Sequence, residues 1–468
     1  MITIRSLIPS YVHNDSFEVL YRTFETATNF HIRLKAIQCI RKQLSLDQTA
    51  KLDEIIKLGI VKDIVRVLSN SFMETAIRLE AAWILTNIAS GKNRHTAHVV
   101  SCGVLPVVVR IIQAEGPPGD GKWNSLVEKN IWIVGNIVGD GAKLRGLVLE
   151  QGVFEALLGL VRRDDFDGPI GESILQHSHW VIGNVFRHGA FPGSLQMAKE
   201  YLEVLKAILP NHEDNLHHLS WVVWSLHYIG NCDQDHARLT SEDVILRYVI
   251  SGIEQRQNVS LINASLCTLK HIAAADGQVL YRIIRKSASF LTSFRFLLKH
   301  PTERVKCRAF ALMAIFTEEA NQELVQEIID AQIFPMLCRP MKRSPLSRKE
   351  TASKILFNLV SGGTQDQLEW LVKAHVFQVM GRNLTAKSLK LQKNLTQTIL
   401  LILDKFCGTH YCNYFRKDLS SKAQEILELA KQAGMESMLF QSLSGNDPWE
   451  SYQLKLMILI RYYDYEYA

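Results

Sequence analysis

Several features that mark membrane proteins and enzymes are missing from this chain of 468 residues. No stretch reaches 18 apolar residues, so the sequence predicts no transmembrane helix. The first residues lack the basic start, apolar run and small-residue cleavage site of a secretion signal. No Gly-rich phosphate loop, Gly-x-Ser-x-Gly elbow or HExxH motif occurs. We therefore expect no enzymatic activity, no cofactor and no membrane partner.

Metal sites, disulfides and nucleic-acid binding are not indicated either. The eight cysteines are scattered, which predicts reduced and mostly buried thiols. Six histidines between residues 177 and 218 lie on two repeats without a recognised ligand spacing, so no metal site is predicted. The segment from Cys407 to Cys412 lacks a second ligand pair. The net charge of +6 is mild and forms no long block, so we expect no nucleic-acid partner.

The sequence does contain one pattern four times, a tryptophan followed four residues later by an asparagine or, once, a tyrosine. The pairs are Trp83–Asn87, Trp132–Asn136, Trp180–Asn184 and Trp224–Tyr228. Residues four apart lie on the same face of a helix. The tryptophans follow one another at 49, 48 and 44 residues, close to the roughly 40–47-residue period of armadillo and HEAT solenoids. We predict an all-α solenoid with one indole and one amide in each repeat.

The period continues where the tryptophans end. Cys267, Phe310 and Lys354 take the place of the tryptophan, and Asn358 follows Lys354 by four residues. Most repeats also contain a Gly or equivalent turn followed at once by an apolar helix, as at 58–68 and 102–112. The apolar spacing therefore maintains the fold, and the Trp/Asn pair is dispensable for folding.

A basic, proline-containing segment, KRSPLSRK, occupies residues 342–349. A solvated loop between helices is the simplest interpretation of such a charge run. A localisation signal and a phosphate-binding patch are the alternatives.

Particular strings resemble the importin-alpha (karyopherin-alpha) family. They are AAWILTNIASG, IWIVGNIVGD and HWVIGNVFR around the first three tryptophans, and SGGTQDQLEWLV and NLTAKSLKLQ at 361–372 and 383–392. The resemblance implies a right-handed armadillo superhelix of about ten repeats over residues 17–468. Residues 1–16 form a short N-terminal segment, and residues from about 423 to 468 form a C-terminal capping repeat.

The resemblance also implies a nuclear-import adaptor that shuttles between cytoplasm and nucleus and binds cargo through an extended Lys/Arg-rich nuclear localisation signal. Asp140 would pair with the key cargo lysine. The residues expected in the major groove are Trp83, Asn87, Gly91, Thr96, Glu128, Trp132, Asn136, Asp140, Trp180, Asn184, Trp224 and Tyr228. The alternative is a scaffold on the same fold that binds a non-nuclear partner.

Elementary chemistry agrees with such a groove. Asparagine amides offer both a donor and an acceptor to the backbone of an extended peptide. Parallel indoles leave slots for the methylenes of lysine or arginine, and a cation beside a ring gains about 0.5–2 kcal/mol. A carboxylate at the end of a slot selects a cation.

The sequence departs from the family at its start and in its second site. Only about sixteen residues precede the first repeat, with one arginine and no lysine, where the family has a basic arm that binds importin beta. Either the sequence starts downstream of the arm or the protein lacks it. We therefore do not expect importin beta to bind in the usual way, whereas an export receptor remains a candidate partner. Cys267, Phe310, Lys354 and Asn358 form a degenerate second site.

The major groove is altered as well. Lys129 stands one turn before Trp132 in place of a neutral polar residue, and His177 stands before Trp180 in place of an amide. Together with the positive net charge, these residues predict a low affinity for basic peptides.

Overall fold

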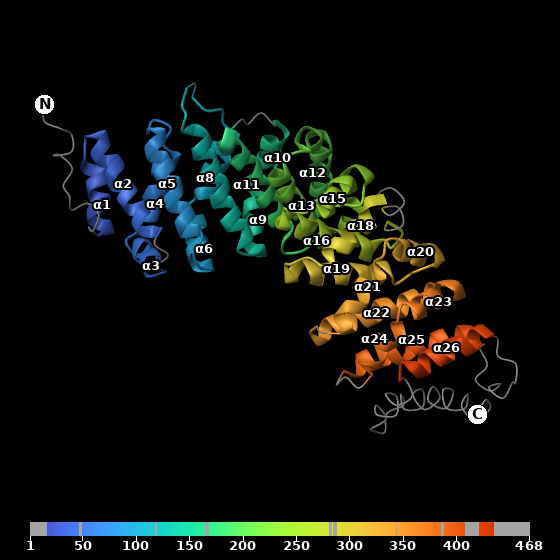
Figure 1. Cartoon of the computed structure of the whole chain (residues 1–468). Coiled ribbons are helices and arrows are strands. Elements are labelled where there is room, and N and C mark those ends of the chain that lie inside the picture. The colour runs from blue at the N-terminus through green and yellow to red at the C-terminus, as the bar shows by residue number, and fades with distance from the viewer. Residues whose placement is uncertain are drawn as a thin grey trace, which may run out of the picture. The chain divides into compact units, whose positions relative to one another are not determined.

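The computed structural model describes residues 16–434 except for 46–48, 118, 164–167, 280–282, 284–287, 343, 385–387 and 408–420. Within these residues every regular element is a helix and no strand occurs (Figure 1). The expected N-terminal segment up to residue 15, most of the expected capping repeat and the segment between Cys407 and Cys412 lie outside the described residues. The all-α prediction is confirmed for the part that is described.

The chain forms two compact units, residues 1–248 and 249–468. The first unit is built from successive helices: α1 (Phe17–Thr26), α2 (Phe30–Leu44), α3 (Thr49–Lys57), α4 (Ile60–Ser69), α5 (Thr75–Ala89), α6 (Asn93–Ser101), α7 (Val104–Gln113), α8 (Trp123–Gly139), α9 (Ala142–Glu150), α10 (Val153–Arg163), α11 (Gly168–Phe186), α12 (Ser194–Ile208), η2 (Leu209–His212), α13 (Leu216–Gly230) and α14 (Gln234–Leu239). Helix α15 (Asp243–Glu254) spans the boundary between the units.

The turns that precede the apolar helices depend on glycine. Gly59 and Gly103 have φ of 73° and 84°, a left-handed conformation that other residues rarely adopt. One helix ends there, and α4 or α7 begins at the next residue and buries most of its apolar side chains. The predicted pattern of a turn followed at once by an apolar helix is therefore confirmed in these repeats.

The longest helices of the repeats pack side by side in chain order. In the first unit α2 contacts α5, α5 contacts α8, α8 contacts α11 and α11 contacts α13, as can be followed from left to right in Figure 1. We call α5, α8, α11 and α13 the row helices, because each carries one of the four tryptophans. The Gly/Pro-rich segment between α7 and α8 contains no helix among its described residues.

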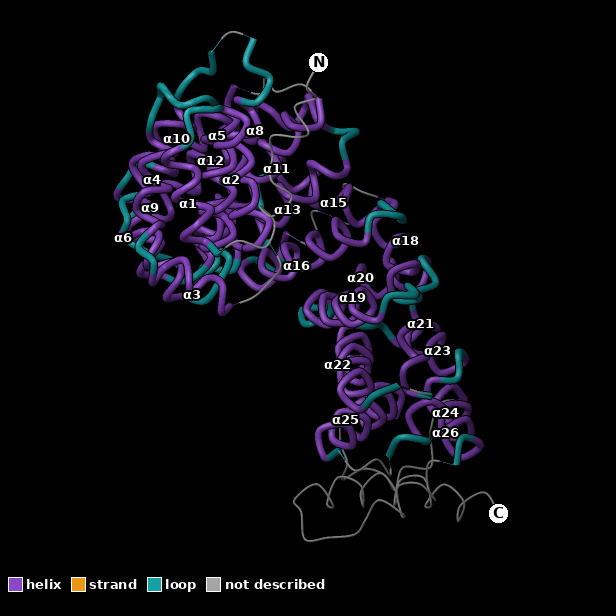
Figure 2. Tube along the Cα trace, turned by 90° about the vertical axis from the view of Figure 1, so that its left-hand side faces the viewer, coloured by secondary structure: helices purple, strands orange, loops and turns teal. Residues whose placement is uncertain are grey.

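The second unit repeats this arrangement. Its helices are α16 (Val259–Ala275), α18 (Ala288–Leu297), α19 (Glu303–Phe316), α20 (Gln322–Asp330), α21 (Phe334–Cys338), η3 (Arg339–Met341), α22 (Leu346–Gly362), α23 (Gln365–Lys373), α24 (Val376–Gly381), α25 (Leu389–Cys407) and α26 (Ser421–Gln432). Helices α19, α22 and α25 form one layer, and α21 and α24 lie in a second layer beside it (Figure 2).

The structure bears on two expectations from the sequence, which concern transmembrane helices and the state of the cysteines. No single helix there is long and apolar enough to cross a membrane, although α6 and α7, bent by 75°, together meet the length and composition criteria. Six described cysteines are free thiols, as expected. They are less buried than expected: Cys39 and Cys338 are buried, three are half-buried and Cys307 is exposed.

Close packing of the row helices requires glycine on α8. A Cβ built on Gly135 would lie 2.1 Å from the indole of Trp180 on α11, which is closer than any real contact. The next row tryptophan therefore rests directly on the backbone of the preceding row helix. A Cβ built on Gly183 would also be crowded, though less severely: it would lie 3.1 Å from Ser225 and 3.3 Å from Tyr228 of α13.

We predict that Gly135→Ala lowers the free energy of unfolding by about 1–3 kcal/mol, because the methyl group overpacks the contact with Trp180. Urea unfolding measures the change. Gly159→Ala on α10 is the matched control, because nothing lies within 4 Å of its Cβ. The control should gain about 0.5–1 kcal/mol from helix propensity. Equal gains in both variants would contradict the close approach.

Candidate functional site

The four tryptophans form a row on the surface of the first unit. Trp83, Trp132, Trp180 and Trp224 are all half-buried, one on each row helix. Ring contacts connect the first three: the side chain of Lys129 lies between Trp83 and Trp132, and that of His177 lies between Trp132 and Trp180. The first three indoles therefore form the predicted ladder, but the two slots between them are already filled.

The row asparagines are anchored to the preceding helix. The amide nitrogen of Asn87 donates to Ser45 Oγ at 3.1 Å, and that of Asn136 donates to the Thr86 carbonyl at 3.3 Å. Asn184 donates to the Gly135 carbonyl at 3.4 Å. With the nitrogen held by the protein, the amide oxygens of Asn87 and Asn136 are left to accept from a ligand backbone. Asn184 is only 2% exposed, so it mainly joins α11 to α8.

The slot between Trp83 and Trp132 contains the ammonium group of Lys129. Its nitrogen is 5.0 Å from the Trp83 ring centroid and 4.6 Å from the Trp132 ring centroid. It also forms an ion pair with Glu128 at 3.0 Å, and the lysine side chain is only 13% exposed. Glu128 was expected to receive a cation from the ligand, but it receives one from its own chain.

A second cation covers the other side of Trp83. The Arg41 guanidinium on α2 lies 4.2 Å from the Trp83 ring centroid and pairs with Glu80 at 2.5 Å. The sequence interpretation missed Arg41, because it precedes Trp83 by more than forty residues and nothing in its local sequence marks it. Only the packing of α2 against α5 places it there.

His177 fills the next slot as a neutral group. Its ring centroid is 5.1 Å from that of Trp132 and 6.3 Å from that of Trp180, edge to face in both cases. Ser173 Oγ lies 3.2 Å from His177 Nδ1 and donates to Glu128 at 2.5 Å. Burial lowers the pKa of His177 below 6.5, against the opposing effect of Glu128. The imidazole is therefore uncharged at neutral pH.

Two polar atoms of α8 and its C-terminal cap lack partners among the described residues. The indole nitrogen of Trp132 is buried without an acceptor, and Oδ2 of Asp140 is buried without a donor. Asp140 caps the C-terminus of α8, where a negative charge is unfavourable because of the helix dipole. The indole N–H would suit a ligand that brings an acceptor, and the Asp140 carboxylate would suit a ligand that brings a donor with a positive charge.

Of the remaining residues expected in the groove, Thr96 is buried in the core, whereas Trp224 and Tyr228 lie together in an aromatic cluster on α13. Thr96 is fully buried and donates to the Ala89 carbonyl at 3.1 Å, so it cannot line a groove. Gly91 packs against His95, whose Nδ1 would be 2.3 Å from an added Cβ. Trp224 and Tyr228 have ring centroids 6.4 Å apart, and the His227 ring lies between 5 and 6 Å from each.

The expected second site in the second unit needs one correction. Cys267 on α16 is half-buried, Lys354 on α22 is exposed and paired with Glu318, and Asn358 donates to Thr317 Oγ1 at 3.2 Å. Phe310, however, is only 2% exposed and does not continue the outward positions. On α19 the next residue, Ala311, is the partly exposed one. A shift of one residue rotates a helix position by about 100°, which turns the phenyl ring inward.

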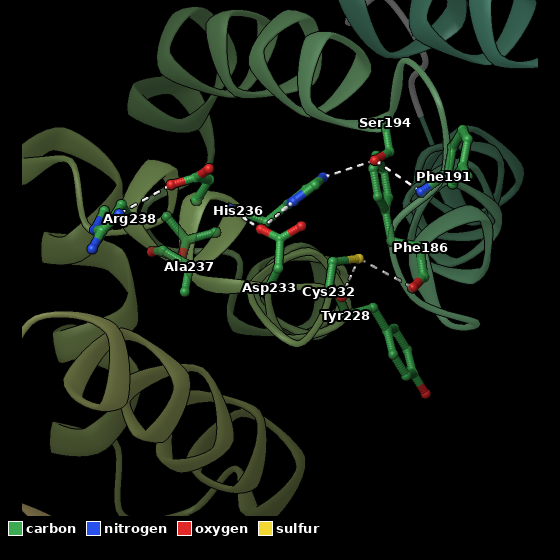
Figure 3. Close-up of polar contacts among 11 residues, drawn as sticks. Phe186, Phe191, Ser194, Tyr228, Cys232, Asp233, His236, Ala237 and Arg238 are labelled. Carbon is green, nitrogen blue, oxygen red and sulfur yellow. Dashed lines mark hydrogen bonds and ion pairs between the residues drawn. The ribbon is translucent and has the colours of Figure 1, made fainter.

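A serine, a histidine and an aspartate are aligned as in a hydrolase but are structural (Figure 3). His236 Nδ1 is 2.8 Å from Asp233 Oδ1, and its Nε2 is 3.0 Å from Ser194 Oγ. Ser194 and His236 are each only 2% exposed, and Ser194 Oγ already accepts from the Phe191 N–H at 3.2 Å. A nucleophile must reach substrate, so this line of bonds joins α14 to the start of α12. The described residues contain no group of three or more His, Cys, Asp or Glu placed to hold a metal ion.

The proteins with a similar sequence include importin alpha subunits. The chain is 26% identical to importin subunit alpha-1b of Oryza sativa subsp. japonica over 245 residues, which cover 52% of this chain and 43% of the relative. It is 25% identical to importin subunit alpha-1a of the same species over 305 residues, or 65% of this chain and 54% of the relative. The chain thus spans about half the length of these relatives. No protein-family model matches it.

The fold also has a counterpart among solved structures. The crystal structure of an engineered protein superimposes with a TM-score of 0.72, covering 96% of this chain and 99% of that chain at 16% identity. At that identity the likeness concerns the fold alone.

The buried imidazole of His177 predicts a pH dependence. Because its folded pKa lies below 6.5, the unfolded chain binds more protons than the folded chain just below that pH. The free energy of unfolding should therefore fall as the pH drops from 7.5 to 5.5. We predict that His177→Gln reduces this drop, whereas His31→Gln, at an exposed position, does not. Urea unfolding at the two pH values measures both, and an unchanged drop in His177→Gln would contradict the prediction.

Proposed function

We propose that this chain, a divergent importin-alpha-like armadillo protein, binds an extended segment of a partner protein along the row of Trp83, Trp132 and Trp180. The preferred segment is lysine-containing, as in a nuclear localisation signal. One observation carries the proposal: the slot between Trp83 and Trp132 already holds a lysine ammonium against a carboxylate. The position of Lys129 supports the proposal, because a cargo lysine would make the same contacts with the two indoles and with Glu128.

The backbone of the segment would be held by the row asparagines. The amide oxygens of Asn87 and Asn136 accept backbone N–H groups from an extended chain without regard to its sequence. The unpartnered Trp132 nitrogen would donate to a ligand carbonyl, and Asp140 would receive a second cation. Hydrogen bonds to the backbone of the ligand would thus give affinity for any extended segment, and the slots would give specificity for its side chains.

The resident side chains make the row self-occupied. A cargo lysine has to displace Lys129, which loses its contacts with two indoles and with Glu128. A ligand that binds only a minor conformation is weakened by the fraction of molecules in that conformation. The affinity for a basic signal is therefore low unless Lys129 leaves its slot.

The same observation favours a second candidate function. If Lys129 and His177 stay in place, the row accepts an extended segment that has few basic residues, and the protein serves as an armadillo scaffold for a non-nuclear partner. The net charge of +6 also favours neutral or acidic partners over basic ones.

As a nuclear adaptor, the protein would move between cytoplasm and nucleus with its cargo. We do not propose the family's basic arm as its link to importin beta, and an export receptor is a further partner to test.

We predict that Lys129→Gln raises the affinity for a lysine-rich peptide about tenfold, or ~1.4 kcal/mol, because the slot loses its resident cation and Glu128 is left without its ammonium partner. Fluorescence anisotropy with a labelled peptide of four consecutive Lys/Arg residues measures this. Lys143→Gln removes the same charge from an exposed site on α9 and serves as the control. Asp140→Asn should weaken the same peptide about tenfold.

Peptides of equal length with serine or glutamate in place of the basic residues separate the two candidates. Tighter binding of the serine or glutamate peptide by the unmodified protein would favour the scaffold and reject the import signal. If no peptide binds either the unmodified protein or Lys129→Gln, the row is not a peptide site.

A further inference from the structure

A basic pocket lies in the second unit and shares no residue with the tryptophan row. Its volume is about 750 Å³, within the roughly 300–1,000 Å³ typical of small-molecule sites. It is enclosed by the α18–α19 and α21–α22 connections, by α19 and α22, and by the end of α24. In Figure 2, α19 and α22 belong to one layer, and α21 and α24 belong to the layer beside it.

The lining of the pocket is strongly positive. Seven of its 14 residues are lysine or arginine, and none is aspartate or glutamate. Four of these cations have no acidic partner and no side-chain hydrogen bond among the described residues: Lys299, Arg339, Lys342 and Arg382. Cations that gather without counter-charges repel one another, which is a cost unless an anion joins them.

The other three cations are only partly neutralised. Glu303 pairs with both Lys306, at 3.0 Å, and Arg348. The Nε of Arg348 is nevertheless buried without an acceptor. Lys349 donates to Asn383 Oδ1 at 2.9 Å, a neutral partner that leaves its charge uncompensated. One carboxylate outside the lining thus serves a pocket of seven positive charges.

The helix ends that meet at the pocket add to this potential. Arg348 and Lys349 are the third and fourth residues of α22, and Lys306 is the fourth residue of α19. The N-terminus of a helix carries a partial positive charge and normally attracts acidic side chains. Cations at these positions on two helices oppose the dipole, so the folded chain keeps an unfavourable arrangement that a bound anion would relieve.

We infer that this pocket binds a compact ligand with several phosphate groups, of the inositol polyphosphate class, either free or as a lipid headgroup. Arginine and lysine at several depths match phosphates spread around a small ring. Met336, which is half-buried, provides apolar surface for its carbon skeleton, and the buried side chains of Phe310 and Met341 form the floor beneath it. A volume of about 750 Å³ that opens to the surface suits a compact molecule.

Calorimetric titration of the full chain with inositol hexakisphosphate at 150 mM salt tests the inference. We expect one ligand per chain and a higher melting temperature in its presence. The double variant Lys342→Gln/Arg382→Gln, which changes two exposed and unpartnered side chains, should bind at least tenfold more weakly. Lys270→Gln/Arg295→Gln removes the same charge from exposed sites of the same unit outside the pocket and should bind as before.

The outcomes are distinct. No binding, equal weakening by both double variants, or tighter binding of single-stranded RNA than of the polyphosphate would overturn the inference. Sedimentation with vesicles that contain phosphatidylinositol bisphosphate identifies the source: binding to them assigns a lipid headgroup, and binding of the soluble ligand alone assigns a free polyphosphate. Peptide binding to the tryptophan row should be unchanged in both double variants, so failure of one proposal does not affect the other.

Discussion

The close contact between neighbouring row helices is the constraint on which the described structure depends. Each row helix presents backbone to the next: Trp180 rests on Gly135, and the amides of Asn136 and Asn184 donate to carbonyls of the preceding row helix. These contacts bury apolar surface and satisfy polar groups between repeats, so a solenoid without a central core remains ordered. They also fix the indoles at regular intervals, and the slots between the indoles are therefore a product of the packing itself.

The slots carry their own occupants, and this decides how the row can act. Lys129 and His177 converge on Glu128 from the same face as the tryptophans. A buried carboxylate needs a partner, so in the absence of a ligand the chain provides one. Binding then becomes an exchange of one cation for another, in which the ligand gains only the difference between its own contacts and those of Lys129. A relative with a neutral residue at this position would lack that competition.

Much of the fold could be read from residues in sequence order, and less of the site. The tryptophan spacing predicted the helices that carry the row, and Gly59 and Gly103 predicted the starts of the apolar helices. Asn87 and Asn136 were found because they recur with the period of the tryptophans, whereas Glu128 was expected from the family resemblance. Arg41, Thr96 and Phe310 were missed or misplaced, because cross-repeat packing and a helix rotation of one residue have no signature in a linear pattern. The sequence did identify Lys129 and His177 as residues that differ from the family pattern. It could not predict that their side chains fill the slots between the indoles.

The sequence by itself determined the periodic part of this protein: helices of the right length, their turns, and the face on which indoles and amides recur. These depend on interactions between residues a few positions apart, which a repeat preserves. Only the tertiary structure showed that Lys129 and His177 fill the slots and that lysine and arginine side chains between residues 298 and 383 line one pocket. The basic pocket there joins side chains from three repeats, and the segment 342–349 gave only part of it. Charged residues that are tens of positions apart in the sequence become neighbours through packing between repeats. A local sequence pattern contains no information about such contacts.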